Sequence, residues 1–334
     1  LIYAPGHPHN LTSFVWVDPT GKARSAGLPA RQYLPFDLSP DGRRLAFCVS
    51  TGEGDEAEIW VHDWRQGTTS RLTPRSGEGH KALYRFPRWT PDGRNVIYVA
   101  RQEGKWRLLW QSTDGGVNAF ELWPGKRSIP AGQEFFYLYP ASFAPDGSTM
   151  MLFGLSAERS IEIFTMRLEH GFRPPAGELE AFLGSPFADS FGQISPDGRW
   201  MVYTSDQTGR WEIYVTSYPK PGATYLISRG NGGHKPMWNP AASEIVYRLG
   251  TKMYAVDVTF SPTFRAGVPR LLFEGPYPSI PGFDWDIAPD GKEFLLLENK
   301  DVLKPVTTLT VITNFFDELR RLVPPGGGKV NAKP

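Results

Sequence analysis

The sequence predicts an all-β fold built from a repeated four-stranded unit. A Pro-Asp-Gly motif recurs with its aspartate at Asp41, Asp92, Asp146, Asp197 and Asp290, and a degenerate copy, "WNPAASEIVY", has Ala241 at that position. The successive spacings are 51, 54, 51, 44 and 49 residues. A repeat of about 40 to 50 residues that contains four short strands is typical of a β-propeller, in which each blade is one antiparallel sheet.

Within each unit, a short apolar strand ends at Ser/Thr/Ala-Pro-Asp-Gly. An alternating strand follows, such as "RRLAFCV" or "RWMVYTS", and after a polar loop comes a third strand, such as "EIWVHDW" or "WEIYVTSY". A weaker fourth strand, such as "TSRLT" or "TYLIS", closes the unit. Aromatic and β-branched residues are enriched in all four segments, as expected of strands.

The Pro-Asp-Gly motif itself is interpreted as a tight turn. Proline sets φ for the second turn position, aspartate can accept a bond from its own backbone two residues on, and glycine supplies a positive φ. We therefore expect a hairpin between the first and second strands of each unit, and neither catalysis nor metal binding by these aspartates.

The two ends of the chain determine how many blades are expected. "LIYA", "SFVWVDPTGK" and "ARSAG" predict three strands at the N-terminus, and "FDWDIAPDGKEFLLLE" with "TTLTVITNFF" predicts three more at the C-terminus. With five complete units this gives about 26 strands, between the roughly 24 of six blades and 28 of seven. We favour seven blades, with six as the close alternative, in a ring closed by pairing of N- and C-terminal strands.

The last residues predict a helix and a tail. "NFFDELRRLV" (314–323) has Asn314 as N-cap, acidic residues in its first turn and arginines near its end. "PPGGGKVNAKP" (324–334) has the composition of a disordered tail. Because no segment resembles a linker, we expect one propeller domain over residues 1–323 and a disordered tail over 324–334.

Charge and composition exclude some partners. Lys and Arg (36) balance Asp and Glu (35), without a basic cluster, so neither nucleic acid nor an anionic membrane is an expected partner. No apolar stretch approaches the roughly 20 residues of a membrane span, so no membrane insertion is expected in this chain. The single cysteine, Cys48, lies in an apolar strand and is expected to be a buried thiol. The chain starts at Leu1 rather than Met, so we expect a fragment or processed form.

Three segments carry a family resemblance: "SPDGRWMVYTSDQTGRWEIYVTSYPKPG", "FRAGVPRLLFEG" and "LTVITNFFDELRRLVP". They resemble the TolB-like propeller modules, with their Pro-Asp-Gly, WD-like repeats, that follow the kinase domain and membrane segment of bacterial serine/threonine kinases. The resemblance implies an extracytoplasmic or periplasmic module, tethered by an upstream membrane segment, that binds protein, peptide or a small molecule. It also implies that the kinase itself lies outside this chain.

Catalytic signatures are absent from the sequence. It contains no Gly-rich phosphate loop, His-Arg-Asp loop or Asp-Phe-Gly motif, and no Gly-x-Ser-x-Gly, His-Glu-x-x-His or Cys-x-x-Cys pattern. The sequence therefore leaves open whether the protein is an enzyme. It also identifies neither the ligand nor the oligomeric state.

Propeller topology nevertheless gathers a set of polar residues at one face. If all Pro-Asp-Gly turns lie on one face, the loops that precede the first strands lie on the other, around the mouth of the central tunnel. These loops carry Arg31, Tyr33, His80, Lys81, Tyr84, Arg85, Gln133, Glu134, Tyr137, Asp189, His234, Lys235 and Asp284.

Two functions fit such a ring. The first is binding of a ligand, for which the candidates are Arg31, Arg85, Asp189, Lys235 and, at the start of a third strand, Trp211. The alternative is a metal-dependent hydrolase of an ester, lactone or phosphoester, in which a divalent Ca, Zn or Mn ion activates water. Its candidate metal ligands are His80, His234, Asp189 and Asp284, and its candidate catalytic residues are His80, His234 and Glu134. No cofactor is certain, and binding without catalysis is the favoured hypothesis.

Overall fold

The computed structural model describes residues 2–3, 11–51, 56–75, 82–102, 104–115, 119–123, 135–156, 161–168, 179–241, 243–260, 263–299 and 310–311. The chain divides into two compact units, of which the larger spans Leu11–Lys300. In the smaller unit, β1 (Ile2–Tyr3) pairs antiparallel with β27 (Thr310–Val311). No helix occurs among the described residues, and the predicted helix (314–323) and tail (324–334) lie outside them.

The larger unit contains 25 described strands, β2 to β26, arranged in antiparallel sheets. One of these sheets has eight strands in two halves. The first half is β4 (Tyr33–Leu38), β5 (Arg44–Ser50), β6 (Ala57–Asp63) and β7 (Thr68–Arg71), and the second is β8 (Ala82–Trp89), β9 (Asn95–Gln102), β10 (Lys105–Ser112) and β11 (Phe120–Trp123). Among the described residues, a single parallel bridge, Ala57 with Leu83, joins the two halves.

Three further sheets follow in chain order with the same pattern. They are β12 (Phe135–Phe143), β13 (Thr149–Ser156), β14 (Glu162–Arg167) and β15 (Leu179–Ala181); β16 (Asp189–Ile194), β17 (Trp200–Ser205), β18 (Glu212–Ser217) and β19 (Tyr225–Leu226); and β20 (His234–Trp238), β21 (Glu244–Leu249), β22 (Lys252–Thr259), β23 (Arg265–Ala266) and β24 (Arg270–Glu274). In the last of these, β23 and β24 both pair with β22.

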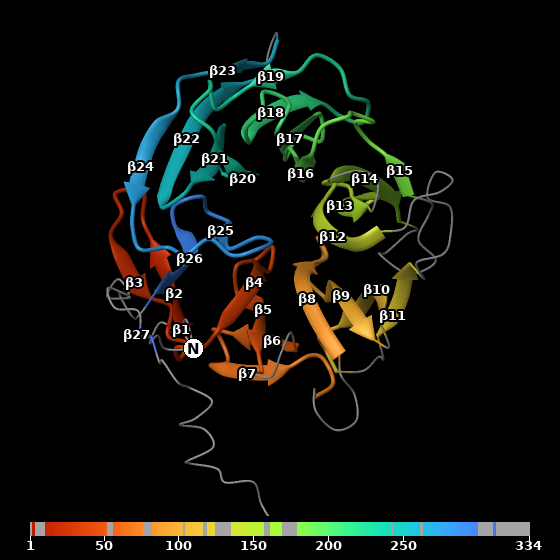
Figure 1. The fold of residues 1–334 in the computed structure, drawn as a ribbon, viewed down its shortest axis with the longest axis vertical. Coiled ribbons are helices and arrows are strands. Elements are labelled where there is room, and N and C mark those ends of the chain that lie inside the picture. Colours follow the sequence, from red (N-terminus) through yellow and green to blue (C-terminus); the bar gives the residue numbers. More distant parts are fainter. Residues whose placement is uncertain are drawn as a thin grey trace, which may run out of the picture. The chain divides into compact units, whose positions relative to one another are not determined.

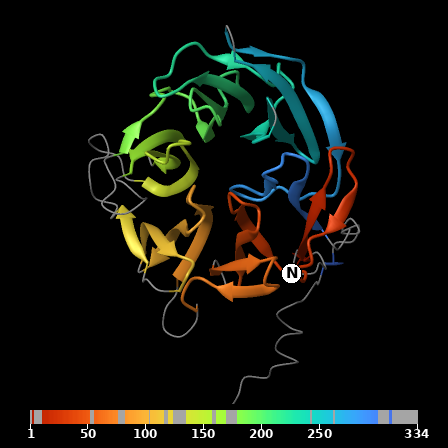
Figure 2. The same cartoon turned by 180° about the vertical axis from the view of Figure 1, so that it is seen from behind.

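One more sheet combines strands from distant parts of the sequence. Its order is β25 (Trp285–Ile287), β26 (Phe294–Asn299), β2 (Thr12–Val17) and β3 (Ala23–Ser25). Strands β2 and β26 pair along six residues, from Thr12 with Asn299 to Val17 with Phe294. The sheets of this unit surround a common centre, with β4, β8, β12, β16, β20 and β25 nearest to it (Figure 1), and the opposite side shows the same arrangement (Figure 2).

The Pro-Asp-Gly segments form the expected hairpin turns between the first and second strands. In the first of them, the Gly42 N–H donates to the carbonyl of Ser39 (2.7 Å), and Asp41 Oδ1 accepts from the Arg43 N–H (3.1 Å). The five turn glycines all have a positive φ of 66° to 70°: Gly42, Gly93, Gly147, Gly198 and Gly291. In the degenerate copy, Asn239 Oδ1 instead accepts from the Ala241 N–H (3.1 Å).

Apolar side chains fill the space within and between sheets. The repeated strand positions of Trp60, Trp89, Trp110 and Trp238 predict packing between blades; Trp89, Trp110 and Trp238 are buried, and Trp60 is half-buried. Cys48 is fully buried, and burial raises the pKa of its thiol to about 12, which confirms the predicted buried thiol.

Two turn glycines allow a matched test of this packing. At Gly93 a Cβ would meet only ordinary contacts, the nearest at 3.7 Å, whereas at Gly42 it would lie 2.8 Å from Cδ of Pro289. We expect Gly93→Ala to lower the free energy of unfolding by about 1 to 2 kcal/mol through its left-handed backbone alone. Gly42→Ala should cost at least about 1 kcal/mol more, because the close contact adds overpacking. Urea unfolding of both variants checks this, and equal losses would contradict the packing against Pro289.

Candidate functional site

The innermost strands share an irregularity that shapes the centre of the unit. Pairing shifts register within β4, β8, β12, β16 and β20, each time shortly before the turn. Three residues at equivalent places, Phe86, Phe191 and Lys235, have a positive φ of 58°, 55° and 55°. Bulges of this kind bend a strand and redirect its side chains, and they are frequent next to functional sites.

A cavity of about 230 Å³ lies between the innermost strands on the side of the turns, since it reaches Pro240 of the degenerate turn. All six innermost strands contribute to it. Its lining residues are Asp37, Arg88, Trp89, Ala141, Ser142, Phe143, Gln193, Met237, Trp238, Pro240, Asp286 and Ile287. The sequence-based expectation placed function on the opposite face, so this cavity is a site that it did not anticipate.

Asp37 and Arg88 form a buried ion pair in the wall of this cavity. Arg88 Nη1 donates to Asp37 Oδ1, and the Trp89 N–H donates to Asp37 Oδ2 (2.7 Å). The side chains of Arg88 and Asp37 are only 9% and 8% exposed. Burial raises the pKa of the Asp37 carboxyl, and the neighbouring Arg88 charge opposes that rise.

Asp286 lies in the same cavity without an ion-pair partner among the described residues. Its Oδ2 accepts from the Leu38 N–H and its Oδ1 from the Ile287 N–H, both at 2.8 Å. Burial, followed by repulsion from Asp37, raises the pKa of Asp286 to about 7, against the weaker effect of Arg88. The cavity therefore holds a carboxyl group that changes charge near neutral pH.

Asp37, Arg88 and Asp286 were all missed as candidates from sequence, although a signal was present. Each lies four residues before the central position of a Pro-Asp-Gly motif, at Asp41, Asp92 and Asp290. The equivalent residues in the other units are Ser142, Gln193 and Met237, which also line the cavity. Aligning the repeats position by position would have identified this inward-facing set.

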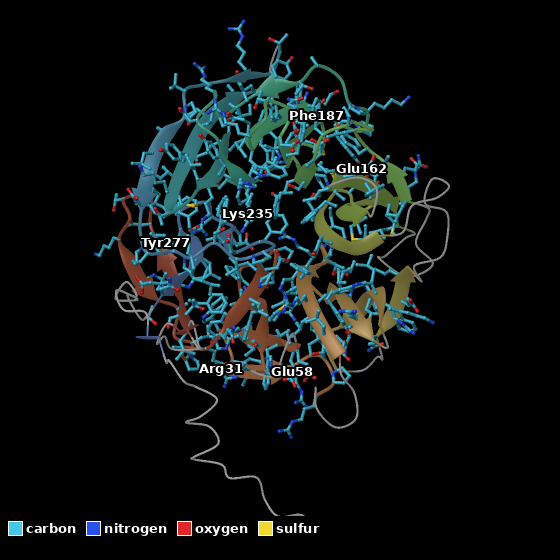
Figure 3. All side chains as sticks on the ribbon, in the orientation of Figure 1. Arg31, Glu58, Glu162, Phe187, Lys235 and Tyr277 are labelled. Atoms are coloured by element: carbon cyan, nitrogen blue, oxygen red, sulfur yellow. The ribbon has the colours of Figure 1, made fainter. Side chains whose placement is uncertain are left out.

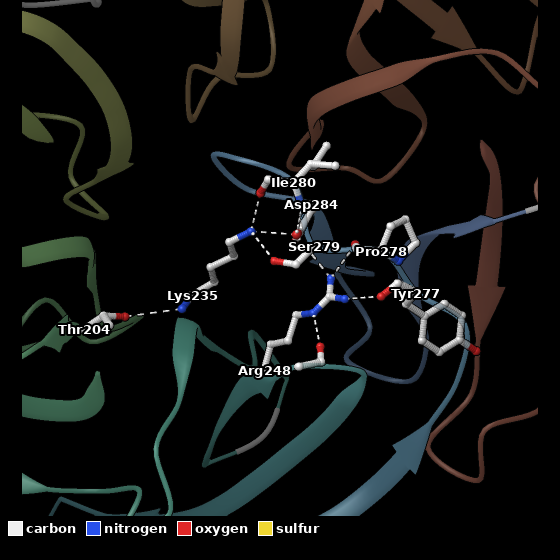
Figure 4. Close-up of polar contacts among 9 residues, drawn as sticks. Thr204, Lys235, Arg248, Tyr277, Pro278, Ser279, Ile280 and Asp284 are labelled. Carbon is white, nitrogen blue, oxygen red and sulfur yellow. Dashed lines mark hydrogen bonds and ion pairs between the residues drawn. The ribbon is translucent and has the colours of Figure 1, made fainter. Parts of the chain in front are cut away.

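A second charged cluster combines Lys235 of β20, Arg248 of β21 and Asp284, which directly precedes β25 (Figure 4). Asp284 Oδ2 is 2.6 Å from Lys235 Nζ and 3.2 Å from Arg248 Nη1. The three side chains, of Lys235, Arg248 and Asp284, are 6%, 3% and 0% exposed. Burial lowers the pKa of Lys235, and the Asp284 charge opposes this change.

This cluster fixes the segment that leads into β25. Arg248 donates to the carbonyls of Tyr277 and Pro278, and Lys235 Nζ donates to that of Ile280 (2.5 Å). The segment then places the Phe283 ring 5.1 Å from the Phe191 ring and 3.7 Å from the Arg88 guanidinium carbon. The Lys235 cluster therefore supports the segment whose Phe283 packs on Arg88 of the cavity.

The structure brings together three of the predicted ring residues, His234, Lys235 and Asp284. Burial, followed by repulsion from Lys235, lowers the pKa of His234 to about 4, so its imidazole is neutral at pH 7. Trp211 lies beside it, with the ring centroids 5.0 Å apart. Lys235 and Asp284 bind each other, so the structure uses these two candidates inside the protein rather than on an exposed tunnel mouth.

Three other candidates, Asp189, Arg31 and Arg85, make none of the contacts of this cluster. Asp189 is buried and accepts from Ser185 Oγ, and burial raises its pKa. Arg31 is exposed over the Trp60 ring, and in the view of Figure 3 it lies toward the periphery whereas Lys235 lies near the centre. Arg85 is half-buried, and its Nε donates no hydrogen bond to any residue that the structure describes.

His80 and Glu134 lie outside the described residues, so the catalytic and metal-binding hypotheses that include them stay predictions. Within the described part of the chain, no group of three His, Cys, Asp or Glu residues is placed to hold a metal ion. Likewise, no helix in the described part is long and apolar enough to cross a membrane.

A larger pocket, of about 560 Å³, lies beside the turns that follow β12 and β16. Its charged residues are already paired or exposed: Asp197 binds Arg199 (2.8 Å), Asp146 accepts from Ser148 (3.0 Å), and Arg167 is exposed. It holds no buried charge, so the central cavity is the stronger candidate.

Comparison with known proteins shows what this fold resembles. No protein-family model matches the chain. An uncharacterized peptidase of Bacillus subtilis (strain 168), YuxL, is 23% identical over 204 residues, which are 51% of this chain and 29% of YuxL, so the chain spans under a third of that relative.

Among solved structures, a protein from Agrobacterium tumefaciens described as TolB matches with a TM-score of 0.63 and 16% identity, covering 87% of this chain and 99% of that one. An oligogalacturonate lyase in complex with manganese matches with a TM-score of 0.53 and 15% identity, over 86% of this chain and 78% of the lyase. These likenesses show a TolB-like β-propeller fold and extend no further than the fold.

Proposed function

We propose that this chain is a ligand- or protein-binding β-propeller whose binding site is the central cavity on the side of the turns. The observation that carries the proposal is the cavity itself, because six strands from different parts of the sequence place buried charged groups in one small concave space. Rigid strands that present a few polar groups in an apolar pocket are typical of ligand sites. This site replaces the opposite face that the sequence favoured.

The proposal includes a specific architecture, with six blades in place of the favoured seven. The six innermost strands each begin a group of four or five antiparallel strands, and this supports six blades. Within the described part of the chain, the two groups that share one sheet are paired with each other only at the parallel bridge of Ala57 with Leu83. The pairing of β2 with β26, and the hydrogen bond that the Leu38 N–H donates to Asp286, support closure of the ring by strands from the two ends of the unit. The cavity would then occupy one end of the central tunnel.

We further propose an extracytoplasmic location and a sensor or scaffold role, downstream of a kinase and its membrane segment. The TolB-like fold supports this proposal, together with the sequence resemblance to kinase-associated propeller modules. Expected partners are a protein, a peptide or a small molecule.

The alternative is a metal-dependent hydrolase. Two similar proteins support it: the peptidase relative, and the lyase whose structure contains manganese. Under the binding proposal, protein purified without chelator should contain less than about 0.1 equivalent of Ca, Zn or Mn, since three or four protein ligands are needed for a tight site. It should also show no EDTA-sensitive turnover of ester or phosphotriester substrates. Elemental analysis and a turnover assay test both points, and a stoichiometric metal with chelator-sensitive turnover would overturn the binding-only proposal.

A cavity-filling variant tests where ligands bind. Gln193 lines the cavity and is half-buried, so Gln193→Trp should fill it, whereas Gln66 is exposed in the turn after β6, so Gln66→Trp serves as the matched control. We expect small molecules that bind the wild type in ligand-observed NMR to lose binding at least tenfold in Gln193→Trp and to keep it in Gln66→Trp. Unchanged binding in a folded Gln193→Trp protein would place the site elsewhere.

A further inference from the structure

The charges around the central cavity are unevenly paired. Arg88 binds Asp37, whereas Asp286 accepts only from the backbone N–H groups of Leu38 and Ile287. No other charged residue lines the cavity, so its wall carries one unmatched negative charge whenever Asp286 is ionised. Asp286 is also less buried than Asp37, which makes it the carboxylate that an occupant can reach.

The same wall contains hydrogen-bond donors that lack an acceptor. Arg88 is 7% exposed, and its Nη2 has no hydrogen-bond partner among the described residues. A buried donor without a partner costs about 1 to 3 kcal/mol, and an oxygen atom brought within hydrogen-bond distance of it recovers that cost. The Gln193 side chain lines the cavity as well, and its amide makes no hydrogen bond to a described residue.

The rest of the wall is apolar and aromatic. The indole N–H of Trp89 donates to the backbone carbonyl of Asp37 (3.1 Å), and that of Trp238 donates to the backbone carbonyl of Gln193 (3.0 Å). What remains of these indoles for an occupant is carbon surface, and aromatic surfaces attract cations rather than anions. The volume of about 230 Å³ is below the roughly 300 to 1,000 Å³ of pockets for drug-sized ligands, so a small group or a chain end fits best.

We infer that the cavity binds a primary ammonium group with a neighbouring carbonyl oxygen, the ammonium at Asp286 and the oxygen at the donors of Arg88 and Gln193. A free amino-acid derivative and the amino terminus of a peptide share this chemistry. The inference rests on the proposed function, because it names the ligand of the same cavity. The raised pKa of Asp286, about 7, is consistent with this inference. The ionised carboxylate lacks a positively charged partner among the described residues, and a bound cation would stabilise it.

Four probes separate the two halves of this ligand. Glycinamide and triglycinamide carry both the ammonium and the carbonyl, N-acetylglycinamide lacks the ammonium, and ethylammonium lacks the carbonyl. We expect the first two to bind at pH 7.5 and N-acetylglycinamide to bind at least tenfold more weakly. Ethylammonium should bind about fivefold to tenfold more weakly than glycinamide, because it lacks the carbonyl oxygen and so loses the free energy of about one hydrogen bond. Tighter binding of triglycinamide would assign the site to peptide termini, and tighter binding of glycinamide to free amino-acid derivatives.

Asp286→Asn should lower the affinity for glycinamide at least tenfold while leaving the affinity for N-acetylglycinamide unchanged. In the wild type, glycinamide affinity should rise about fivefold from pH 6 to pH 7.5 as Asp286 ionises, with Asp37 and Arg88 as the other charged groups at the site. Isothermal titration calorimetry measures both effects, and thermal melting checks that the variant is folded. The comparison of probes on the wild type needs no variant at all.

Equal affinity for glycinamide and N-acetylglycinamide would overturn the inference. If other ligands still bind and lose affinity in Gln193→Trp, the proposed function stands and only the ligand class is wrong. If no ligand is sensitive to Gln193→Trp, the proposed function fails as well.

Discussion

Asp284→Ala is expected to lower the free energy of unfolding by about 3 to 5 kcal/mol. The substitution removes the carboxylate that Lys235 and Arg248 share, and it leaves two positive charges that are 6% and 3% exposed without a counter-ion. An unpaired buried charge is strongly destabilising, whereas an intact buried pair contributes little net stability. Urea unfolding followed by tryptophan fluorescence measures the loss.

Glu293→Ala is the matched control for this variant. Glu293 also binds an arginine, Arg24, at 2.7 Å, but these side chains are 34% and 59% exposed. Pairs this exposed are worth about 0.2 to 1 kcal/mol. Similar losses in Asp284→Ala and Glu293→Ala would mean that the Lys235 cluster is solvated and does not hold the Tyr277–Ile280 segment.

Asp286 should make stability fall between pH 5 and pH 8. Its pKa in the folded protein is about 7, above the ordinary value of 3.8, so the folded state binds this proton more tightly than the unfolded chain does. The stability that the bound proton provides is complete below pH 3.8 and is lost as pH rises through 7. Integrated from pH 5 to pH 8, the loss is about 3 kcal/mol.

Asp286→Asn isolates this contribution, because asparagine does not titrate. Relative to the wild type, the variant should gain about 3 kcal/mol of stability between pH 5 and pH 8, as measured by urea unfolding at both values. Asp146→Asn is the control: its carboxylate accepts from Ser148, which lowers its pKa, so its effect should be constant over this range. A constant difference for Asp286→Asn would show that Asp286 is ionised throughout.

Much of the fold could be predicted from sequence because it is encoded by local, repeated signals. The glycine of each turn needs a positive φ, and each turn is flanked by apolar strands, so both the hairpins and the strand order follow from a few residues. Blade number was harder, because it depends on which terminal strands pair, and pairing between β2 and β26 is invisible to local reasoning.

The central cavity was not predicted from the sequence, for a physical reason. The loops before the first strands contain polar residues, and polarity alone does not distinguish a binding ring from an internal ion cluster such as that of Lys235 and Asp284. Asp37, Arg88 and Asp286 lie within apolar strands, where the sequence suggests core. They come together only when strands distant in sequence meet. The Trp89 N–H donates to Asp37 and the Leu38 N–H donates to Asp286, across separations of 52 and 248 residues.

The sheet that contains both β2 and β26 has a consequence for how the protein folds during synthesis. Thr12 pairs with Asn299, so β2 leaves the ribosome long before its partner exists. At about 5 to 20 residues per second, the wait lasts roughly 15 to 60 seconds. During that time β2 and β3 have an open edge, while the sheets from β4 onward can form in order from nearby sequence. Strand β2 thus gains its second neighbour only after nearly all the other strands of this unit have been made. The nascent chain is most exposed to aggregation until β26 has emerged.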